Sequence, residues 1–202
     1  MTDTQEDTRN LVDEYKGLSN EEVFTQLSEK RLSLEVAIEN VEHDFNIGTV
    51  VRNANNFNVS KVHIIGRKKY NRRGAMCTDK YLEIVYWKTA FDFLEDQHNR
   101  DRELVAIENN VSKDVLEEIY GSESVRESGD KCYTGVKSLM IKKFTQNTTL
   151  LFGSEGNGLS EEILQGCNDV REIPDYGSTR SVNVGVASGI AMYEWARQCA
   201  KK

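Results

Sequence analysis

Residues 149–167, TLLFGSEGNGLSEEILQGC, join an apolar run to a helical pattern through a glycine-rich loop. The apolar run TLLFG predicts a short buried strand, and SEEILQGC, which begins at Ser160, has the pattern of a helix. The glycine-rich loop between them leaves a strand and enters a helix, an arrangement typical of α/β proteins. Such proteins bind ligands beyond the carboxyl ends of their strands, so this loop is a candidate binding element.

The same alternation extends through the chain from Leu34. The apolar runs LEVAIENV, KVHIIG, EIVYW and ELVAIE alternate with the helical stretches NIGTVVRNANNF and AFDFLEDQHN. VREIP predicts one more strand, and the chain from Asn183 onward predicts a final helix whose small residues imply close approach by another backbone. Strands that alternate with helices predict an α/β fold with a mostly parallel sheet flanked by helices.

Two regions fall outside this pattern. Residues 1–30 carry eight acidic and three basic side chains, and they predict a partly helical extension in which residues 1–18 lack fixed structure and Ser19 caps a short helix. Residues 31–202 form the main domain. Within it the polar stretch 108–147, where KDVLEEIY predicts a helix and SGDKCYTGVKS a loop, is long for a connection. It is either an insertion or a functional flap.

The charge of the 202-residue chain bears on its partners. A formal charge of −7 argues against nucleic acid, because phosphate contacts are made chiefly by Lys and Arg. Much of the negative charge lies in residues 1–30, however, and a basic segment follows later in the chain. The candidates for RNA contact in it are Arg67, Lys68, Lys69, Arg72 and Arg73. A solvated surface loop is the competing interpretation of this basic segment.

The cysteines and the apolar runs limit the remaining classes. The four cysteines are tens of residues apart and have no neighbouring histidine, so neither a metal site nor a redox motif is expected. Free thiols are typical of a reducing compartment. No apolar run is long enough to span a bilayer, so we expect a cytoplasmic protein without a membrane partner.

The glycine loop from Gly153 to Ser160 constrains its ligand. Gly153 and Gly158 have the spacing of a phosphate-binding loop, but Leu159 stands where that motif needs Lys, and Glu155 places a negative charge where phosphates would lie. Phosphate binding is therefore disfavoured. A ligand that is cationic and lacks phosphate, such as S-adenosylmethionine, fits the loop; an ordinary strand-to-helix turn is the alternative.

Two other segments carry polar residues next to predicted helices. In NIGTVVR, Asn46 either caps the helix or faces a site, and Arg52 taken alone is a surface residue or an ion-pair partner. In IPDYGSTRSVN, an irregular loop delivers Ser181 and Asn183 to the start of the final helix. Ser181 either caps that helix or faces a ligand held by the loop.

Together the segments Asn46–Arg52, Gly153–Ser160 and Ile173–Asn183 resemble the three motifs of the SpoU (TrmH-type) branch of the SPOUT RNA methyltransferases. They match N-x-G-x-x-x-R, x-E-G-x-G-L-S and I-P-x-x-G-x-x-x-S-V-N-V, in that order. The resemblance implies the SPOUT fold with a C-terminal deep trefoil knot, which composition could not predict because knots are so rare. It also implies a homodimer in which each site is completed by the partner.

The resemblance further implies methyl transfer from S-adenosyl-L-methionine to a ribose 2′-hydroxyl of tRNA or rRNA. Arg52 would be the catalytic residue and Asn46 its neighbour, while Glu155, Ser181 and Asn183 would order the site. The implied contacts to the cofactor come from Leu151, Gly153, Ile173, Val182 and Asn183. Two alternatives are a SpoU-like RNA-binding or assembly protein without catalysis, and a SPOUT base methyltransferase, in which an acidic residue often accepts the proton.

Overall fold

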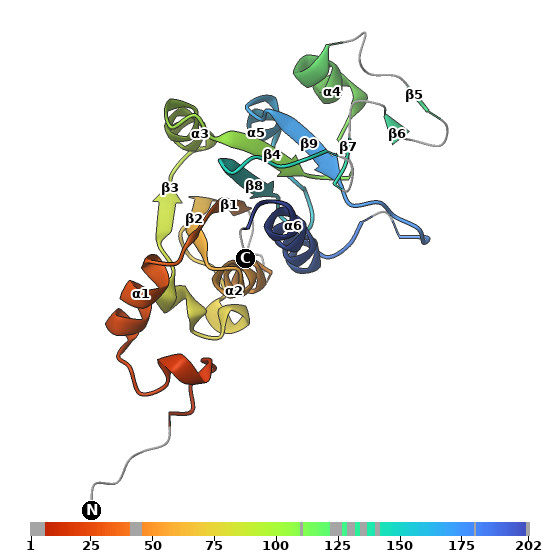
Figure 1. Ribbon diagram of the computed structural model, residues 1–202. Helices are drawn as coiled ribbons and strands as arrows, with labels where there is room; N and C mark the ends of the chain where they lie inside the picture. Colours follow the sequence, from red (N-terminus) through yellow and green to blue (C-terminus); the bar gives the residue numbers. More distant parts are fainter. Residues whose placement is uncertain are drawn as a thin grey trace, which may run out of the picture.

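A seven-stranded sheet forms the centre of the protein. The computed structural model describes residues 7–40, 46–109, 111–121, 127–128, 132–133, 137–139, 142–179 and 181–200. The strand order is β3-β2-β1-β8-β4-β9-β7, and every described pair in the sheet is parallel (Figure 1). The strands are β1 (Leu32–Asn40), β2 (Val59–Gly66), β3 (Ile84–Trp87), β4 (Glu103–Ile107), β7 (Lys137–Ser138), β8 (Thr148–Phe152) and β9 (Asp169–Glu172). The predicted parallel α/β sheet is therefore confirmed.

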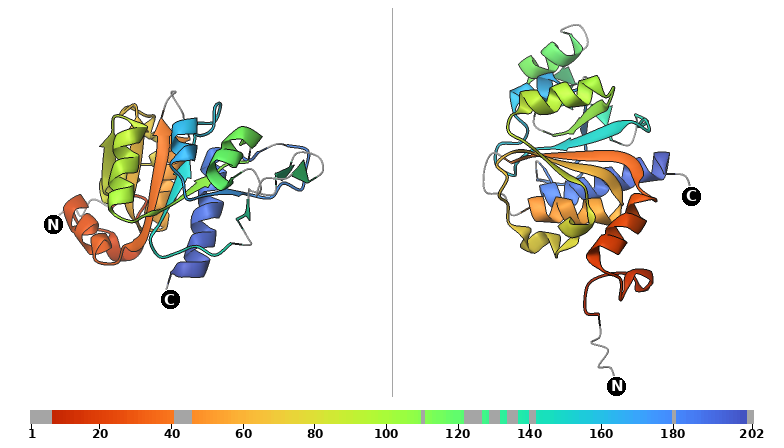
Figure 2. Two further views of the ribbon diagram at one scale, coloured as in Figure 1. Left: turned by 90° about the horizontal axis from the view of Figure 1, so that it is seen from above. Right: turned by 90° about the vertical axis from the view of Figure 1, so that its left-hand side faces the viewer.

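Helices cover both faces of this sheet (Figures 1 and 2). One face carries α2 (Ile47–Asn56) and α6 (Val184–Cys199), and the other carries α3 (Ala90–Asn99), α4 (Lys113–Tyr120) and α5 (Glu161–Gln165). Val36 and Ile38 of β1 join the core under α2 and α6, whereas Ala37 between them joins the core under α3 and α5. This alternation is the period of two that a strand buried on both faces requires.

The strand β8 occupies the middle of the sheet although it comes late in the chain. It pairs with β1 on one side, up to Ile38 opposite Phe152, and with β4 on the other, up to Ala106 opposite Leu151. All five of its residues are buried. The glycine loop that follows it therefore leaves the carboxyl edge of the sheet between two neighbouring strands. The trefoil knot expected in this region stays a prediction.

A buried charged network joins the strands on the α3 face. The Trp87 indole donates to Nδ1 of His63 at 3.0 Å, so Nε2 of His63 carries the proton that reaches Glu35 at 2.8 Å. Arg100 pairs with the same carboxylate, which is 2% exposed. Burial alone would raise the pKa of Glu35, but the hydrogen bonds from His63 and Arg100 outweigh it and lower that pKa to about 2. The network fastens β1, β2 and β3 to the end of α3.

The N-terminal extension has more structure than its polarity indicates. It contains a 3-10 helix, η1 (Asp13–Tyr15), and the helix α1 (Asn20–Ser28). Ser19 caps α1 as predicted, in a capping box with Glu22. The expectation that residues 1–18 lack fixed structure is wrong for the described residues 7–18. Tyr15 is 6% exposed and packs with Val23 and Tyr81, because these apolar side chains form a small third core.

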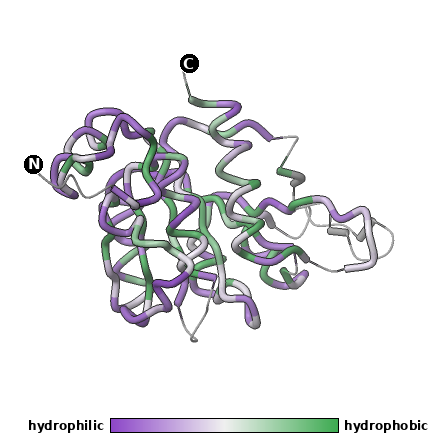
Figure 3. Tube along the Cα trace, turned by 90° about the horizontal axis from the view of Figure 1, so that it is seen from below, coloured by the Kyte–Doolittle hydropathy of each residue, from purple (hydrophilic) through white to green (hydrophobic). Residues whose placement is uncertain are grey.

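The polar stretch 108–147 is described in part. Its predicted helix is α4, and β5 (Glu127–Ser128) pairs antiparallel with β6 (Cys132–Tyr133), where the sequence predicted a loop. The rest of that loop, apart from β7, lies outside the described residues. In the part of the chain that the structure describes, no helix combines the length and apolarity needed to cross a membrane. Figure 3 shows that hydrophobic and hydrophilic stretches alternate along the trace, with hydrophilic ones at many of its outer turns.

Candidate functional site

The glycine loop folds back on itself directly after β8. Ser154 and Gly158 exchange two backbone hydrogen bonds of 3.0 Å. A Cβ atom at Gly153 would lie 2.0 Å from the carbonyl carbon of Gly158, and Gly158 itself has a φ of +65°. Both positions thus require glycine, one for close approach and the other for its backbone conformation.

Three polar side chains from the three predicted segments meet at this loop. The Asn46 amide donates to Oε2 of Glu155 at 2.5 Å. The Asn183 amide donates to Oε1 of Glu155 at 3.0 Å and to Oδ1 of Asn46 at 3.1 Å, across 137 positions of sequence. The Asn46–Glu155–Asn183 cluster therefore brings residues predicted from separate motifs into one place.

The cluster bears on two alternatives that the sequence left open. Asn46 directly precedes α2, but its side chain makes no capping hydrogen bond and turns to Glu155 instead. The residue that caps α6 is Asn183, whose Oδ1 accepts from the backbone N–H of Gly185 at 2.9 Å. Ser181 is thus not the cap, and Asn183 serves both the helix and the cluster.

Close packing of α2 against α6 holds the cluster in place. Asn53 donates to the Gly185 carbonyl at 2.8 Å and to the Ser188 hydroxyl at 3.0 Å. A Cβ atom at Gly185 would lie 2.8 Å from Cγ2 of Thr49, so only glycine permits this approach. The small residues of the final helix, which predicted such an approach, set the helix spacing that brings Asn46 and Asn183 together.

A cavity of about 370 Å³ opens beside the glycine loop. Its walls come from the carboxyl ends of β4 and β8, from the loop itself, and from the segment before α6. The apolar lining residues are Ile107, Phe152, Leu159, Leu164, Ile173, Val182, Val184 and Ala187. Ser154 also lines the cavity; it is 5% exposed, and its hydroxyl has no hydrogen-bond partner among the described residues. A buried hydroxyl in that condition can still accept a partner, such as a water molecule or a ligand.

Most of the predicted site residues lie on this cavity. Its wall includes Gly153, Glu155, Ile173, Ser181, Val182 and Asn183. Leu151 differs: it is 1% exposed within β8, packs into the core under α3 and α5, and does not line the cavity. Its side chain therefore serves the core, because it points to the face of the sheet opposite α2.

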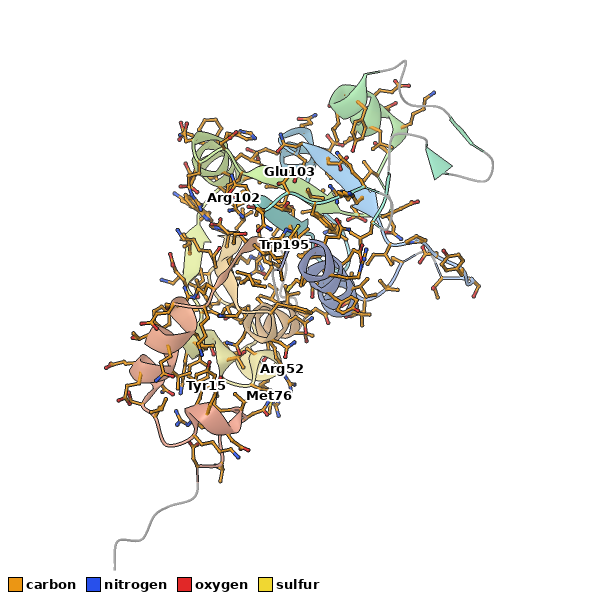
Figure 4. The ribbon with its side chains drawn as sticks, viewed as in Figure 1. Tyr15, Arg52, Met76, Arg102, Glu103 and Trp195 are labelled. Atoms are coloured by element: carbon orange, nitrogen blue, oxygen red, sulfur yellow. The ribbon has the colours of Figure 1, made fainter. Side chains whose placement is uncertain are left out.

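Arg52 lies apart from the cavity. It is exposed on α2 and is not among the lining residues. Because it follows Asn46 by six residues, it lies about 9 Å further along the helix axis and is rotated by roughly 120°. Figure 4 labels Arg52 near Met76, which directly follows a segment that packs on α2. The cluster and the predicted catalytic guanidinium thus occupy different faces of α2.

The basic segment lies against the same helix. It passes through two 3-10 helices, η2 (Arg72–Ala75) and η3 (Thr78–Tyr81), that contact α2. The contact is close, because a Cβ atom at Gly74 would lie 3.0 Å from the backbone nitrogen of Thr49. The five predicted RNA contacts, Arg67, Lys68, Lys69, Arg72 and Arg73, are all exposed. Of these, Arg72 and Arg73 belong to η2 and therefore lie beside the helix that carries Arg52.

Two residues at the end of β4 belong to the site but were not predicted from the sequence. Glu108 lines the cavity, and Asn109 exchanges hydrogen bonds of 3.0 and 3.2 Å with the backbone of Ile173, which fixes the loop after β9. Their only signal in the sequence is their position immediately after the strand ELVAI. A position after a strand points to this site only once β8, which carries the glycine loop, is known to lie beside β4.

Comparison with known proteins gives a consistent set of relatives. A sequence profile described as the SpoU rRNA methylase family matches residues 33–193. An uncharacterized tRNA/rRNA methyltransferase of Mycobacterium leprae is 26% identical over 91% of this chain and 53% of its own length. The tRNA (guanosine(18)-2′-O)-methyltransferase of Aquifex aeolicus is 42% identical over 29% of this chain and 28% of its own. The chain thus spans about half or less of these curated relatives.

Solved structures agree with the observed fold. The crystal structure of the A. aeolicus TrmH/SpoU tRNA modifying enzyme has a TM-score of 0.67 and 26% identity, with 89% of this chain and 83% of that chain covered. The AdoMet-bound rRNA methyltransferase of Sinorhizobium meliloti has a TM-score of 0.65 and 20% identity, with coverages of 87% and 61%. At that identity the second likeness concerns the fold alone.

Proposed function

The chain belongs to the SpoU rRNA methylase family, and from that premise we propose that it transfers a methyl group from S-adenosylmethionine to a ribose 2′-hydroxyl of tRNA or rRNA. The observation that carries this proposal is the Asn46–Glu155–Asn183 cluster at the rim of a cavity. The cytoplasm is the proposed compartment, which the free thiols of Cys77, Cys167 and Cys199 favour.

The residues of the cavity fit S-adenosylmethionine. Glu108 and Glu155 both line it, so it suits a cationic ligand better than a phosphate. The apolar wall suits an adenine ring, and a volume of about 370 Å³ is in the range of small-molecule sites. The unpartnered hydroxyl of Ser154 offers a further polar contact. When bound, the cofactor supplies an electrophilic methyl group.

The protein's own residues position the reacting oxygen. Asn46 and Asn183 are held by Glu155 at the cavity rim, where an incoming ribose would be oriented. Holding the 2′-hydroxyl in line for attack supplies much of the rate by proximity. An arginine guanidinium has only hydrogen-bond donors and keeps its protons in proteins, so Arg52 cannot accept the proton of the 2′-hydroxyl. Its proposed role is to hold the RNA and stabilise negative charge developing on the 2′-oxygen.

A homodimer is part of this proposal, because Arg52 is turned away from the cavity of its own chain. The face of α6 directed to solvent carries Val186, Ile190 and Tyr193, which are 55, 38 and 61% exposed. Their spacing of four and three residues places them on one side of the helix. We expect this face to pack on a second copy, whose cavity receives Arg52. Light scattering should show a dimer that Tyr193→Lys converts to a monomer; a monomeric parent protein contradicts it.

Methyl transfer itself is tested with methyl-labelled S-adenosylmethionine and separate tRNA and rRNA fractions. The expected result is label in one fraction, lost when the purified protein is omitted. RNA binding without label in either fraction would favour the non-catalytic alternative. Label in a nucleobase would favour a base methyltransferase.

A further inference from the structure

Glu108 and Ser154 lie at the carboxyl ends of two neighbouring strands. Ala106 of β4 is opposite Leu151 of β8, so two residues further on Glu108 comes level with Gly153, next to Ser154. The backbone N–H of Glu108 donates to the Arg171 carbonyl at 3.1 Å, which continues the pairing of β4 with β9. The backbone of Glu108 is therefore fixed by its hydrogen bond to β9.

The carboxylate of Glu108 lies against the glycine loop. Its Oε2 is 2.5 Å from the place that a Cβ atom of Gly158 would occupy, and its Oε1 accepts from the backbone N–H of Asn109 at 3.0 Å. Ser154, on the other strand of the loop turn, is buried and has its hydroxyl unpartnered among the described residues. Glu108 and Ser154 thus both belong to the lining of one cavity and come from adjacent strand ends.

Glu155, the other carboxylate on the wall, has a different setting. It is exposed and accepts hydrogen bonds from the amides of Asn46 and Asn183 at the rim. Glu108 instead directly follows Ile107 and is on the strand next to Phe152, both of which belong to the apolar wall. Glu108 is therefore the carboxylate that adjoins apolar residues of the cavity, a setting that suits the nucleoside part of a ligand.

We propose that Glu108 binds the two ribose hydroxyls of the nucleoside cofactor and that the Ser154 hydroxyl completes this subsite. The inference rests on the proposed cofactor. A carboxylate has two oxygens that accept from the two hydroxyls of a cis-diol, as an acidic residue accepts from the ribose of dinucleotides in other α/β proteins. Glu108 is then a specificity-determining residue that selects a ribonucleoside.

Calorimetric binding to the ligand-free full chain tests this. The probes are S-adenosylmethionine, 5′-methylthioadenosine, which lacks the amino-acid tail, and the 2′-deoxy form of 5′-methylthioadenosine. Glu108→Gln should weaken the first two by roughly 10- to 100-fold, the effect of losing a charged hydrogen-bond acceptor. The 2′-deoxy probe should bind the parent protein weakly, and Glu108→Gln should reduce its affinity much less than that of the other two probes. Glu162→Gln, at an exposed position on α5, is the matched control and should change nothing.

Each other outcome overturns the inference. Unchanged binding of 5′-methylthioadenosine to Glu108→Gln removes Glu108 from the ribose subsite. If Glu108→Gln weakens the binding of S-adenosylmethionine but not that of 5′-methylthioadenosine, the carboxylate is assigned to the amino group of the cofactor. If the parent protein binds S-adenosylmethionine and methylates RNA while Glu108→Gln does not give the expected binding results, the proposed function stands and only the ribose subsite fails. If the parent binds none of the probes, both fail.

Ser154→Ala separates a ligand contact from a structural role. A buried hydroxyl without a partner costs stability, so the ligand-free variant should unfold at the same denaturant concentration as the parent or a higher one. Binding of 5′-methylthioadenosine should nevertheless weaken several-fold. A less stable variant with unchanged binding would contradict the role proposed for Ser154.

Discussion

At the scale of single residues, Arg52 is exposed on α2 and shares no wall with the cavity. We predict that Arg52→Ala lowers methyl transfer by about 100-fold or more, the usual effect of removing a group that stabilises developing charge. Calorimetric binding of S-adenosylmethionine should stay within a few-fold, because the proposed role of Arg52 is toward the RNA and its 2′-oxygen and not toward the cofactor. Asn56→Ala, exposed on the same helix, is the control. Normal methylation by Arg52→Ala would remove Arg52 from the chemistry.

The sequence predicted the polar residues of the cluster and part of the cavity wall, but it did not predict Glu108 and Ser154 of that wall. Asn46, Glu155 and Asn183 belong to motifs whose spacing is legible along the chain. Glu108 and Ser154 belong together only because β8 lies beside β4. No local sequence pattern predicts that β4 and β8 are neighbours in the sheet. The orientation of Arg52 was equally inaccessible, since a helical repeat gives the angle between residues but not which face meets α6.

At the scale of elements, the glycine loop depends on the contact between Gly153 and Gly158. We predict that Gly153→Ala lowers the free energy of unfolding by about 2 kcal/mol or more, because a Cβ atom there would lie 2.0 Å from backbone. Cofactor binding should be lost with it. Gly177→Ala is the matched control, since no atom lies within 4 Å of its Cβ position. Urea unfolding measures both, and equal midpoints for the two variants would contradict the proposed loop packing.

The basic segment gives a second prediction at this scale. Replacing Arg72 and Arg73 by alanine should weaken RNA binding and reduce the slope of log affinity against log salt by about 1 to 2, as expected for two lost phosphate contacts. The controls are Lys88→Ala and Lys113→Ala, both exposed and outside the basic segment. Titration of labelled RNA at several salt concentrations measures the slope. An unchanged slope would mean that Arg72 and Arg73 do not contact RNA phosphates and would favour the alternative of a solvated surface loop.

At the scale of the whole molecule, the buried network around Glu35 makes stability depend on pH. Because the pKa of Glu35 is lowered to about 2 in the folded protein, its contribution is complete above the ordinary glutamate pKa and is lost as the pH falls toward 2. Glu35→Gln should therefore cost about 3 kcal/mol at neutral pH. The cost should shrink on acidification through that window. Denaturant titrations at several pH values measure it; a difference that is independent of pH would contradict the role of the carboxylate.

The architecture shows what periodicity can and cannot supply. Runs such as KVHIIG and AFDFLEDQHN identified strands and helices correctly, because burial on one or two faces leaves a local pattern. The insertion of β8 between β1 and β4 is a long-range closure with no such pattern. The small core around Tyr15 was not predicted for a related reason. Its apolar residues are too few to make a period, and part of the core comes from Tyr81, far along the chain.

The most direct test uses mass spectrometry of nucleosides. RNA is treated with the full chain and S-adenosylmethionine that carries a deuterated methyl group, and the labelled nucleosides are then identified. Fragmentation separates the base from the sugar. We predict a labelled nucleoside whose label stays with the ribose fragment, present with the parent protein and absent with Arg52→Ala. Label in the base fragment, or an unlabelled RNA that the protein nevertheless binds, would contradict ribose 2′-O-methylation.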